Sequence, residues 1–271
     1  MYLNIEKTFR LVLFHVEDQF RFEGETANVN DFNCIIFFFL CQSSSNTMSN
    51  ASKRFICLNN EGVQMIRNGR YVQAIDCFIS AVKLINHNLE SLKNMPAPCY
   101  ENPDLGSFGM IHSDHQVLSV PVNSYQSQFV FRNPIVVRQD STEKALVQDA
   151  GSHLFMVALY NLALSYHLSA LDRQCVQQLE QALSYYALSY KMLLNERDVV
   201  VSQAMVILNN IGHIHRLLNN EEGAQNCFRY LLTTMLFVQQ SGEAERIKDW
   251  DSFMSNVMHL MVDSRQPAAA A

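Results

Sequence analysis

The chain has 271 residues, of which 48% are hydrophobic and 17% are charged, and its formal net charge is −6 at pH 7. This length and apolar content suffice for one well-filled domain or two small ones. A mildly acidic chain without clusters of Lys and Arg is poorly suited to nucleic acid or to an anionic membrane, so we expect neither as a partner.

Residues 1–47 precede the first regular pattern, and we predict a poorly ordered leader there. The apolar run at 34–41 has eight residues, whereas a helix that spans a bilayer needs about twenty. Acidic residues precede this run, where a secretory signal would carry positive charge. The seven cysteines form no C-x-x-C pair and no zinc-like spacing. We therefore expect reduced thiols in an intracellular, cytoplasmic protein.

The first helical pattern predicts one helix near 53–67 and a second near 71–92. Apolar residues recur at helical spacing in both, and a Gly-containing break separates them. Gly62 in the first helix and Ala74 in the second are small enough to let the two helices approach closely. Phe78 then fills the space beside them. This segment is predicted to be a helical hairpin.

A long insertion is predicted from about 94 to 147, where Pro, Gly, Ser and Asn become frequent. Within it, Phe129-Val130-Phe131 and Ile135-Val136-Val137 resemble short strands, and Arg132-Asn133-Pro134 is a turn signal between them. We expect a small β-hairpin lying against the helices. Insertions of this length are usually functional or disordered.

Two further helical pairs follow, and the last repeats the spacing of the first. Gly212 and Ala224 are 12 residues apart, like Gly62 and Ala74, and Ala224-x3-Phe228 repeats the small-to-aromatic step. In the middle pair the interval from Ala163 to Ala182 is 19 residues. A final amphipathic helix at about 243–262 is predicted to cap the array, and 264–271 is predicted to be a disordered tail.

A Gly in the first helix followed by A-x3-F in the second resembles the tetratricopeptide repeat (TPR) family. The resemblance covers about 52–86 and 155–240, and it implies an all-α solenoid of three helix-turn-helix hairpins plus a capping helix. The β-hairpin would lie in the insertion of a domain at 48–263. With its insertion and alanine-rich end, the chain is also similar to TPR-like proteins of unicellular algae, a resemblance that assigns no activity.

In the TPR family the first helix of each hairpin lines a concave groove, and the residue two before the Gly or Ala is often Asn. Here these residues are Asn60, Asn161 and Asn210, in L-N-N-E-G, L-Y-N-L-A and L-N-N-I-G. Such a row of amides can hold the backbone of an extended peptide, or it can bond across to the neighbouring helix. The groove residues that the resemblance predicts are Asn59, Asn60, Arg67, Tyr160, Asn161, His167, Asn209, Asn210, His213 and Arg216.

These features predict a protein-protein interaction scaffold that binds an extended protein or peptide segment in the groove. If so, the amides should face solvent in the free protein, and protonation of His167 or His213 near pH 6–7 could tune binding. The alternative is a structural or assembly protein that associates, also with itself, through its outer faces or the insertion. That alternative would be favoured by exposed side chains at Phe129, Phe131, Ile135 and Val137, which could add a strand edge to a partner.

An enzyme of unknown type is the third alternative, and the sequence offers no residue set for it. The chain lacks a phosphate-binding loop and a nucleophile motif, so we predict no catalytic residue and no cofactor. His213 and His215 are two apart on a predicted helix and point in nearly opposite directions, so they cannot chelate one ion. We predict no metal site.

Overall fold

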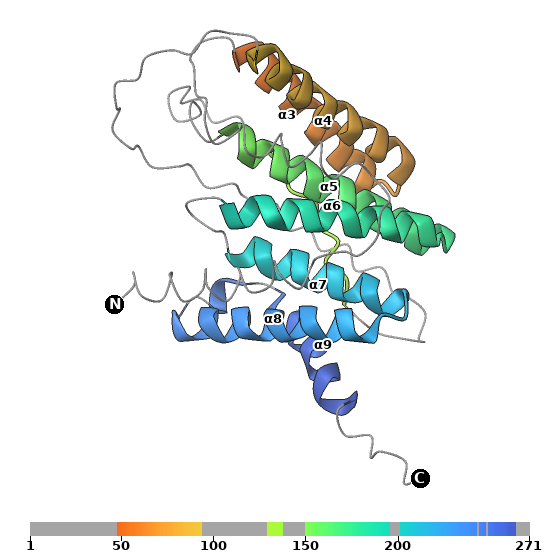
Figure 1. Cartoon of the computed structure of the whole chain (residues 1–271), viewed down its shortest axis with the longest axis vertical. Helices are drawn as coiled ribbons and strands as arrows, with labels where there is room; N and C mark the ends of the chain where they lie inside the picture. The colour runs from red at the N-terminus through yellow and green to blue at the C-terminus, as the bar shows by residue number, and fades with distance from the viewer. Residues whose placement is uncertain are drawn as a thin grey trace. The chain divides into compact units, whose positions relative to one another are not determined.

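A computed structural model describes residues 48–93, 129–137, 150–195, 201–242, 244–247 and 249–263. Every regular element in these residues is a helix, which confirms the all-α class for the described part of the chain (Figure 1). The predicted leader, the tail and the rest of the insertion lie outside the described residues. The helices are α3 (Met48–Arg67), α4 (Tyr71–Lys93), α5 (Ala150–Arg173), α6 (Val176–Asn195), α7 (Val201–Leu217), α8 (Glu221–Gln240), the short 3-10 helix η1 (Ala244–Arg246) and α9 (Trp250–Asp263).

The described helices fall into two compact units. The α3–α6 unit contains α3, α4, α5, most of α6 and residues 133–137. The α7–α9 unit contains α7, α8, η1, α9 and residues 129–132. Each unit therefore has a set of helices and a short piece of the segment that the sequence placed in the insertion.

The α3–α4 hairpin is packed around a small residue and an aromatic ring, as the sequence predicted. A Cβ atom added to Gly62 would lie 2.6 Å from Cζ of Phe78, whose side chain is fully buried. The turn contains Gly69 at φ 71°, a left-handed conformation that glycine adopts without strain. The backbone N–H of Arg70 bonds back to the carbonyl of Met65 at 2.8 Å and closes the end of α3.

Helix α5 is the most deeply buried helix of the α3–α6 unit. Its residues 154–165 are all buried, and α6 packs on it through the ring pairs Tyr160–Tyr186 and Tyr166–Tyr185. Among the described helices, α5 alone is long and apolar enough to span a membrane. However, 89% of its apolar stretch is buried inside the protein, as expected of a core helix.

The longer spacing in the middle pair comes from longer helices. Helix α5 continues for ten residues beyond Ala163, whereas α3 continues for five beyond Gly62. Helix α6 begins six residues before Ala182, whereas α4 begins three before Ala74. The net difference of seven residues is close to two helical turns, so the small residues keep the same face.

The α7–α8 hairpin of the second unit repeats the packing of α3–α4. A Cβ added to Gly212 would lie 2.8 Å from Cε1 of Phe228, again a fully buried ring. Asn220 caps α8, because its side-chain oxygen accepts the backbone N–H of Gly223 at 2.9 Å. Helix α9 buries Phe253 and Val257 in this unit.

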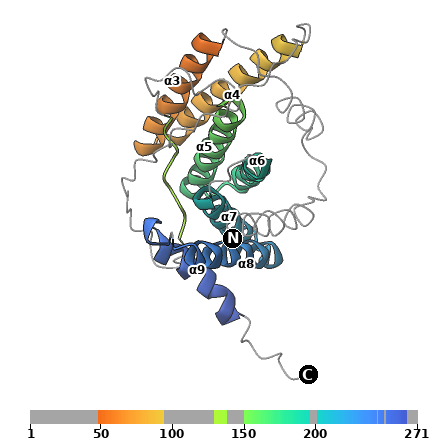
Figure 2. The same cartoon turned by 90° about the vertical axis from the view of Figure 1, so that its left-hand side faces the viewer.

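The predicted β-hairpin is not confirmed. The structure assigns no strand to residues 129–137, the part of the insertion that it describes. Figure 2 shows these residues as a thin yellow-green trace, of which 133–137 belong to the α3–α6 unit and 129–132 to the α7–α9 unit. Their backbone groups bond to asparagine side chains on the helices instead of to a second strand.

Candidate functional site: two asparagine clamps

In the α3–α6 unit, three asparagines hold the backbone of Ile135 and Val137, and we call this set the α3–α5 clamp. Asn161 of α5 accepts the N–H of Ile135 at 2.8 Å and donates to its carbonyl at 2.8 Å. Asn60 of α3 accepts the N–H of Val137 at 3.1 Å and donates to its carbonyl at 2.8 Å. One amide side chain thus pairs with both polar groups of one residue, which requires an extended backbone.

The third member, Asn59, joins the other two into one hydrogen-bonded network. Its Nδ2 donates to the carbonyl of Ile135 and to Oδ1 of Asn60, both at 3.2 Å. Its Oδ1 accepts a bond of 2.9 Å from Nδ2 of Asn161. A backbone N–H can only donate, so Oδ1 of Asn161 must face the N–H of Ile135, and Oδ1 of Asn60 must face that of Val137. These two contacts fix the orientation of each amide in the network. Both hydrogens of Asn59 and Asn161 are used.

The α7–α9 unit contains a second set with the same pattern, the α7–α9 clamp, which holds Phe129 and Phe131. Asn210 of α7 accepts the N–H of Phe131 and donates to its carbonyl, both at 3.0 Å. Asn256 of α9 accepts the N–H of Phe129 at 2.9 Å and donates to its carbonyl at 2.7 Å. Asn209 takes the place that Asn59 has in the other clamp.

Asn209 repeats each bond of Asn59. It donates to the carbonyl of Phe129 at 3.1 Å and to Oδ1 of Asn210 at 3.2 Å, and it accepts from Asn256 at 2.7 Å. The two adjacent asparagines come from L-N-N-x-G in both units, and the third comes from a later helix. Both clamps thus combine the same local motif with an amide from α5 or α9.

The clamp asparagines are not open to solvent. Asn59, Asn161, Asn209, Asn210 and Asn256 are fully buried, and only Asn60 is partly exposed. The expectation that the row faces solvent in the free protein is therefore wrong for Asn161 and Asn210. Asn161 combines the two alternatives for the row, because it bonds to the backbone of Ile135 and, across helices, to Asn59.

The side chains of the held segment, residues 129–137, are largely buried as well. Phe131, Ile135 and Val137 are between 5% and 8% exposed. Phe129, which is half-buried, packs edge-to-face on Phe253 with ring centroids 5.4 Å apart. The exposed apolar edge that would have favoured association through this segment is therefore absent at these residues.

The remaining predicted site residues of the α3–α6 unit lie at different places. Tyr160 is buried next to Asn161, and its hydroxyl donates to the carbonyl of Asn133 at 3.2 Å. His167 is fully buried two turns further along α5, where its ring contacts Tyr186 edge-to-face. Arg67 lies half-buried in the last turn of α3. Of these three residues, Tyr160 contacts the held segment directly.

In the α7–α9 unit, His213 stands one turn after Asn210 and is 7% exposed. Burial, together with the positive charges of Arg132 and Arg216, lowers the pKa of His213 from 6.5 to about 4. The suggested titration of His213 near pH 6–7 is therefore wrong for the folded protein. Arg132 follows Phe131 in the held segment, so the segment itself contributes to the lowered pKa of His213.

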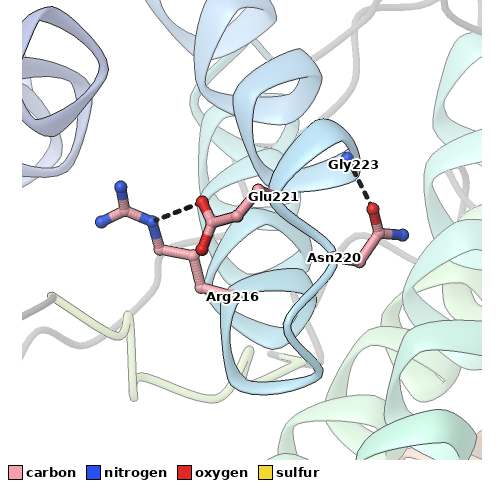
Figure 3. A network of polar contacts seen from close by, with 4 residues as sticks. All are labelled: Arg216, Asn220, Glu221 and Gly223. Atoms are coloured by element: carbon pink, nitrogen blue, oxygen red, sulfur yellow. Dashed lines mark hydrogen bonds and ion pairs between the residues drawn. The ribbon is translucent and has the colours of Figure 1, made fainter. Parts of the chain in front are cut away.

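Arg216, another predicted groove residue, is directed toward the start of α8. Its Nε lies 3.8 Å from a carboxylate oxygen of Glu221, and Asn220 beside it caps the helix (Figure 3). The guanidinium also lies 5.9 Å from the ring centroid of Phe228. Glu221 is 60% exposed, so this ion pair contributes little to stability.

Sequence reasoning missed Asn256, because the last helix was interpreted only as an apolar cap. A signal was present. Asn256 lies between Phe253 and Val257 on the buried face of α9, and an asparagine on such a face needs a partner for its amide. The same argument holds for the buried Asn161 and Asn210, which the L-x-N pattern had already singled out.

Candidate metal ligands do not cluster in the part of the chain that the structure describes. In that part of the chain, no three His, Cys, Asp or Glu side chains are placed to hold a metal ion. Cys227 is fully buried, and burial raises the pKa of its thiol far above the usual range. Comparison with protein-family models, curated proteins and solved structures found no match for this chain.

Proposed function

We propose that this chain is a protein-protein interaction scaffold of the TPR-like solenoid class that binds extended polypeptide segments through its asparagine clamps. It is a binding protein rather than an enzyme, it needs no cofactor or metal, and it acts inside the cell, in the cytoplasm. The observation that carries the proposal is the paired bonding of one amide to the N–H and C=O of one residue, made by Asn60, Asn161, Asn210 and Asn256.

An amide side chain that pairs with both the N–H and the C=O of one residue recognises the polypeptide backbone rather than a particular side chain. The N–H and C=O groups are the same in every residue except proline, so a segment from another protein can make the same pairs in either clamp. Main-chain hydrogen bonds give affinity in such complexes, and side-chain contacts give specificity. In the described state the occupant is the chain's own segment, residues 129–137.

The chain connections around this segment favour exchange. Thirty-five residues separate Lys93 from Phe129, and twelve separate Val137 from Ala150. Connections of this length allow the segment to leave the helices and return without breaking the chain. An external segment must compete with an attached one, which is always present at the clamps of its own chain. Binding to the unmodified chain is therefore weaker than binding to vacant clamps.

The second candidate, an assembly protein, has one form that these features favour. The segment of one copy can enter the clamps of another copy, which is a domain swap and gives a dimer. Association through an exposed strand edge is not favoured, because Phe131, Ile135 and Val137 are buried. Light scattering on the full chain distinguishes a swapped dimer from a monomer that binds other proteins.

The test uses a vacated variant, in which residues 129–137 of the full chain are replaced by nine Gly and Ser residues. A fluorescent peptide with the sequence of residues 126–140 is titrated with this variant and with the wild type. We expect binding to the vacated variant and at least about tenfold weaker binding to the wild type, because the attached segment competes. Fluorescence anisotropy measures both affinities.

The matched control is the vacated variant with Asn161→Ala and Asn210→Ala, which should lose binding of the peptide. A vacated variant that has wild-type helicity by circular dichroism but does not bind the peptide would contradict the proposal. A vacated variant that does not fold would contradict it as well, because residues 129–137 would then be a fixed part of the fold.

A further inference from the structure

We propose that the α7–α9 clamp selects extended segments with two aromatic side chains separated by one residue. This inference rests on the proposed function and specifies the chemical class of its ligand. The asparagine bonds go to the backbone, so they cannot distinguish one side chain from another. Selection must come from what surrounds the side chains at the positions now taken by Phe129 and Phe131.

Both rings contact Phe253 of α9, which is 1% exposed. Phe129 meets it edge-to-face, with centroids 5.4 Å apart and an interplanar angle of 85°. Phe131 stacks on it at 6.1 Å and 15°. Phe129 and Phe131 also contact each other edge-to-face at 6.4 Å. Both geometries are favourable for aromatic pairs, beyond the gain from burial alone.

The spacing of the two aromatic residues follows from the extended backbone. Side chains two residues apart in an extended segment project to the same side. An aromatic-x-aromatic sequence therefore presents both rings to a single receptor ring while both backbones pair with Asn256 and Asn210. Neither position accepts proline, because each backbone N–H donates to an asparagine.

Helix α9 supplies the ring and the amide together, since Phe253 and Asn256 are three residues apart and share a face of the helix. In α5, the residue three before Asn161 is the buried Ala158, which has no ring to offer. The α3–α5 clamp holds the β-branched Ile135 and Val137. The preference for aromatic residues therefore belongs to the α7–α9 clamp.

The test compares three fluorescent peptides of residues 126–140 on the vacated variant. One has the natural sequence, the second has Phe129→Leu and Phe131→Leu, and the third has Ile135→Leu and Val137→Leu as a matched control. We expect the second to bind about tenfold more weakly than the first, because leucine keeps apolar area but loses the aromatic pairs. The third should stay within about threefold of the first.

Adding Phe253→Leu to the vacated variant should remove the difference between the first and second peptides. If the first two peptides bind the vacated variant equally well, the aromatic preference is wrong, while the proposed binding of extended segments stands. If none of the three peptides binds, the proposed function itself fails.

A second measurement tests the ring contacts in the intact chain, without the vacated variant. In the otherwise intact chain, Phe131→Leu, Phe253→Leu and the double variant are compared by urea unfolding. The double variant should lose clearly less free energy of unfolding than the two single variants lose together, because the two rings contact each other. Additive costs would show that the rings are not coupled and would contradict the inference.

Discussion

The two clamps have the same polar geometry and different apolar surroundings. In each, two adjacent asparagines and a third from a later helix hold two residues that are separated by one. The α3–α5 clamp holds Ile135 and Val137, whereas the α7–α9 clamp holds Phe129 and Phe131 against Phe253. The comparison indicates that the asparagines fix the backbone of an extended segment, and that neighbouring residues decide which side chains fit.

The largest effect is expected for the clamp residues that are fully buried. Asn161→Ala would leave the N–H of Ile135 and Oδ1 of Asn59 without partners in the interior. Each orphaned group costs about 1–3 kcal/mol, so the free energy of unfolding should fall by about 2–5 kcal/mol. Asn210→Ala should cost a similar amount in the other clamp, because it orphans both backbone groups of Phe131. Urea unfolding at pH 7.5 measures both.

Asn60→Ala is the internal control for this prediction. Asn60 is partly exposed, so water can replace its bonds to Val137, and the cost should be about 1 kcal/mol or less. Asn161→Asp keeps the shape of the side chain but removes its donors, and it should be at least as destabilising as Asn161→Ala. Equal costs for Asn60→Ala and Asn161→Ala would refute the role of burial.

A smaller effect is expected at the glycines that follow the asparagines in L-N-N-x-G. A Cβ at Gly62 or Gly212 would press on the buried rings of Phe78 or Phe228. We expect Gly62→Ala and Gly212→Ala each to lower the free energy of unfolding by about 1–2 kcal/mol, because overpacking costs more than the gain in helix propensity. Thermal unfolding, converted to free energy, measures the effect.

The ring contact can be tested separately by adding Phe78→Leu to Gly62→Ala, which shortens the side chain that meets the new methyl group. The double variant should then cost less than the sum of the two single variants. If only one of the two glycines is sensitive, the two hairpins are not equivalent in their packing.

The smallest effect is a pH dependence of the free energy of unfolding, which we expect from His213 in the α7–α9 clamp. His213 stands three residues after Asn210, whereas the buried Val63 stands three after Asn60. The folded pKa of His213 is about 4, below the value of about 6.5 in an unfolded chain. The unfolded state therefore binds a proton first, and stability is lost as pH falls from about 6.5 toward 4. Between pH 7.5 and 5.5 the loss should be about 1 kcal/mol.

His213→Val gives the α7–α9 clamp the residue found in the α3–α5 clamp, and it should remove this part of the pH dependence. The quantity to measure is the free energy of unfolding of the wild type minus that of the variant, at pH 7.5 and at pH 5.5. Burial lowers the pKa of His153 and His215 as well, but both remain in the variant, so their contributions cancel. An unchanged difference between the two pH values would contradict the assignment.

Much of the helical structure and part of the site could be predicted because they depend on local patterns. The 12-residue step from Gly62 to Ala74 placed both helices and the ring of Phe78 correctly, since close helix packing needs a small residue opposite a large one. The L-x-N pattern identified Asn60, Asn161 and Asn210. Asn256 lies outside any repeated pattern, and it was missed for that reason.

Only the tertiary structure decided what pairs with residues 129–137. By itself the sequence determined that this segment is apolar, β-branched and aromatic, and therefore prone to an extended backbone whose N–H and C=O groups need partners. A second strand and a row of amides satisfy that need equally well, and the local sequence is the same in both cases. The tertiary structure decided for the asparagines, because the helices bring amides that are distant in sequence, such as Asn59 with Asn161 and Asn209 with Asn256, within hydrogen-bond reach of the same carbonyl.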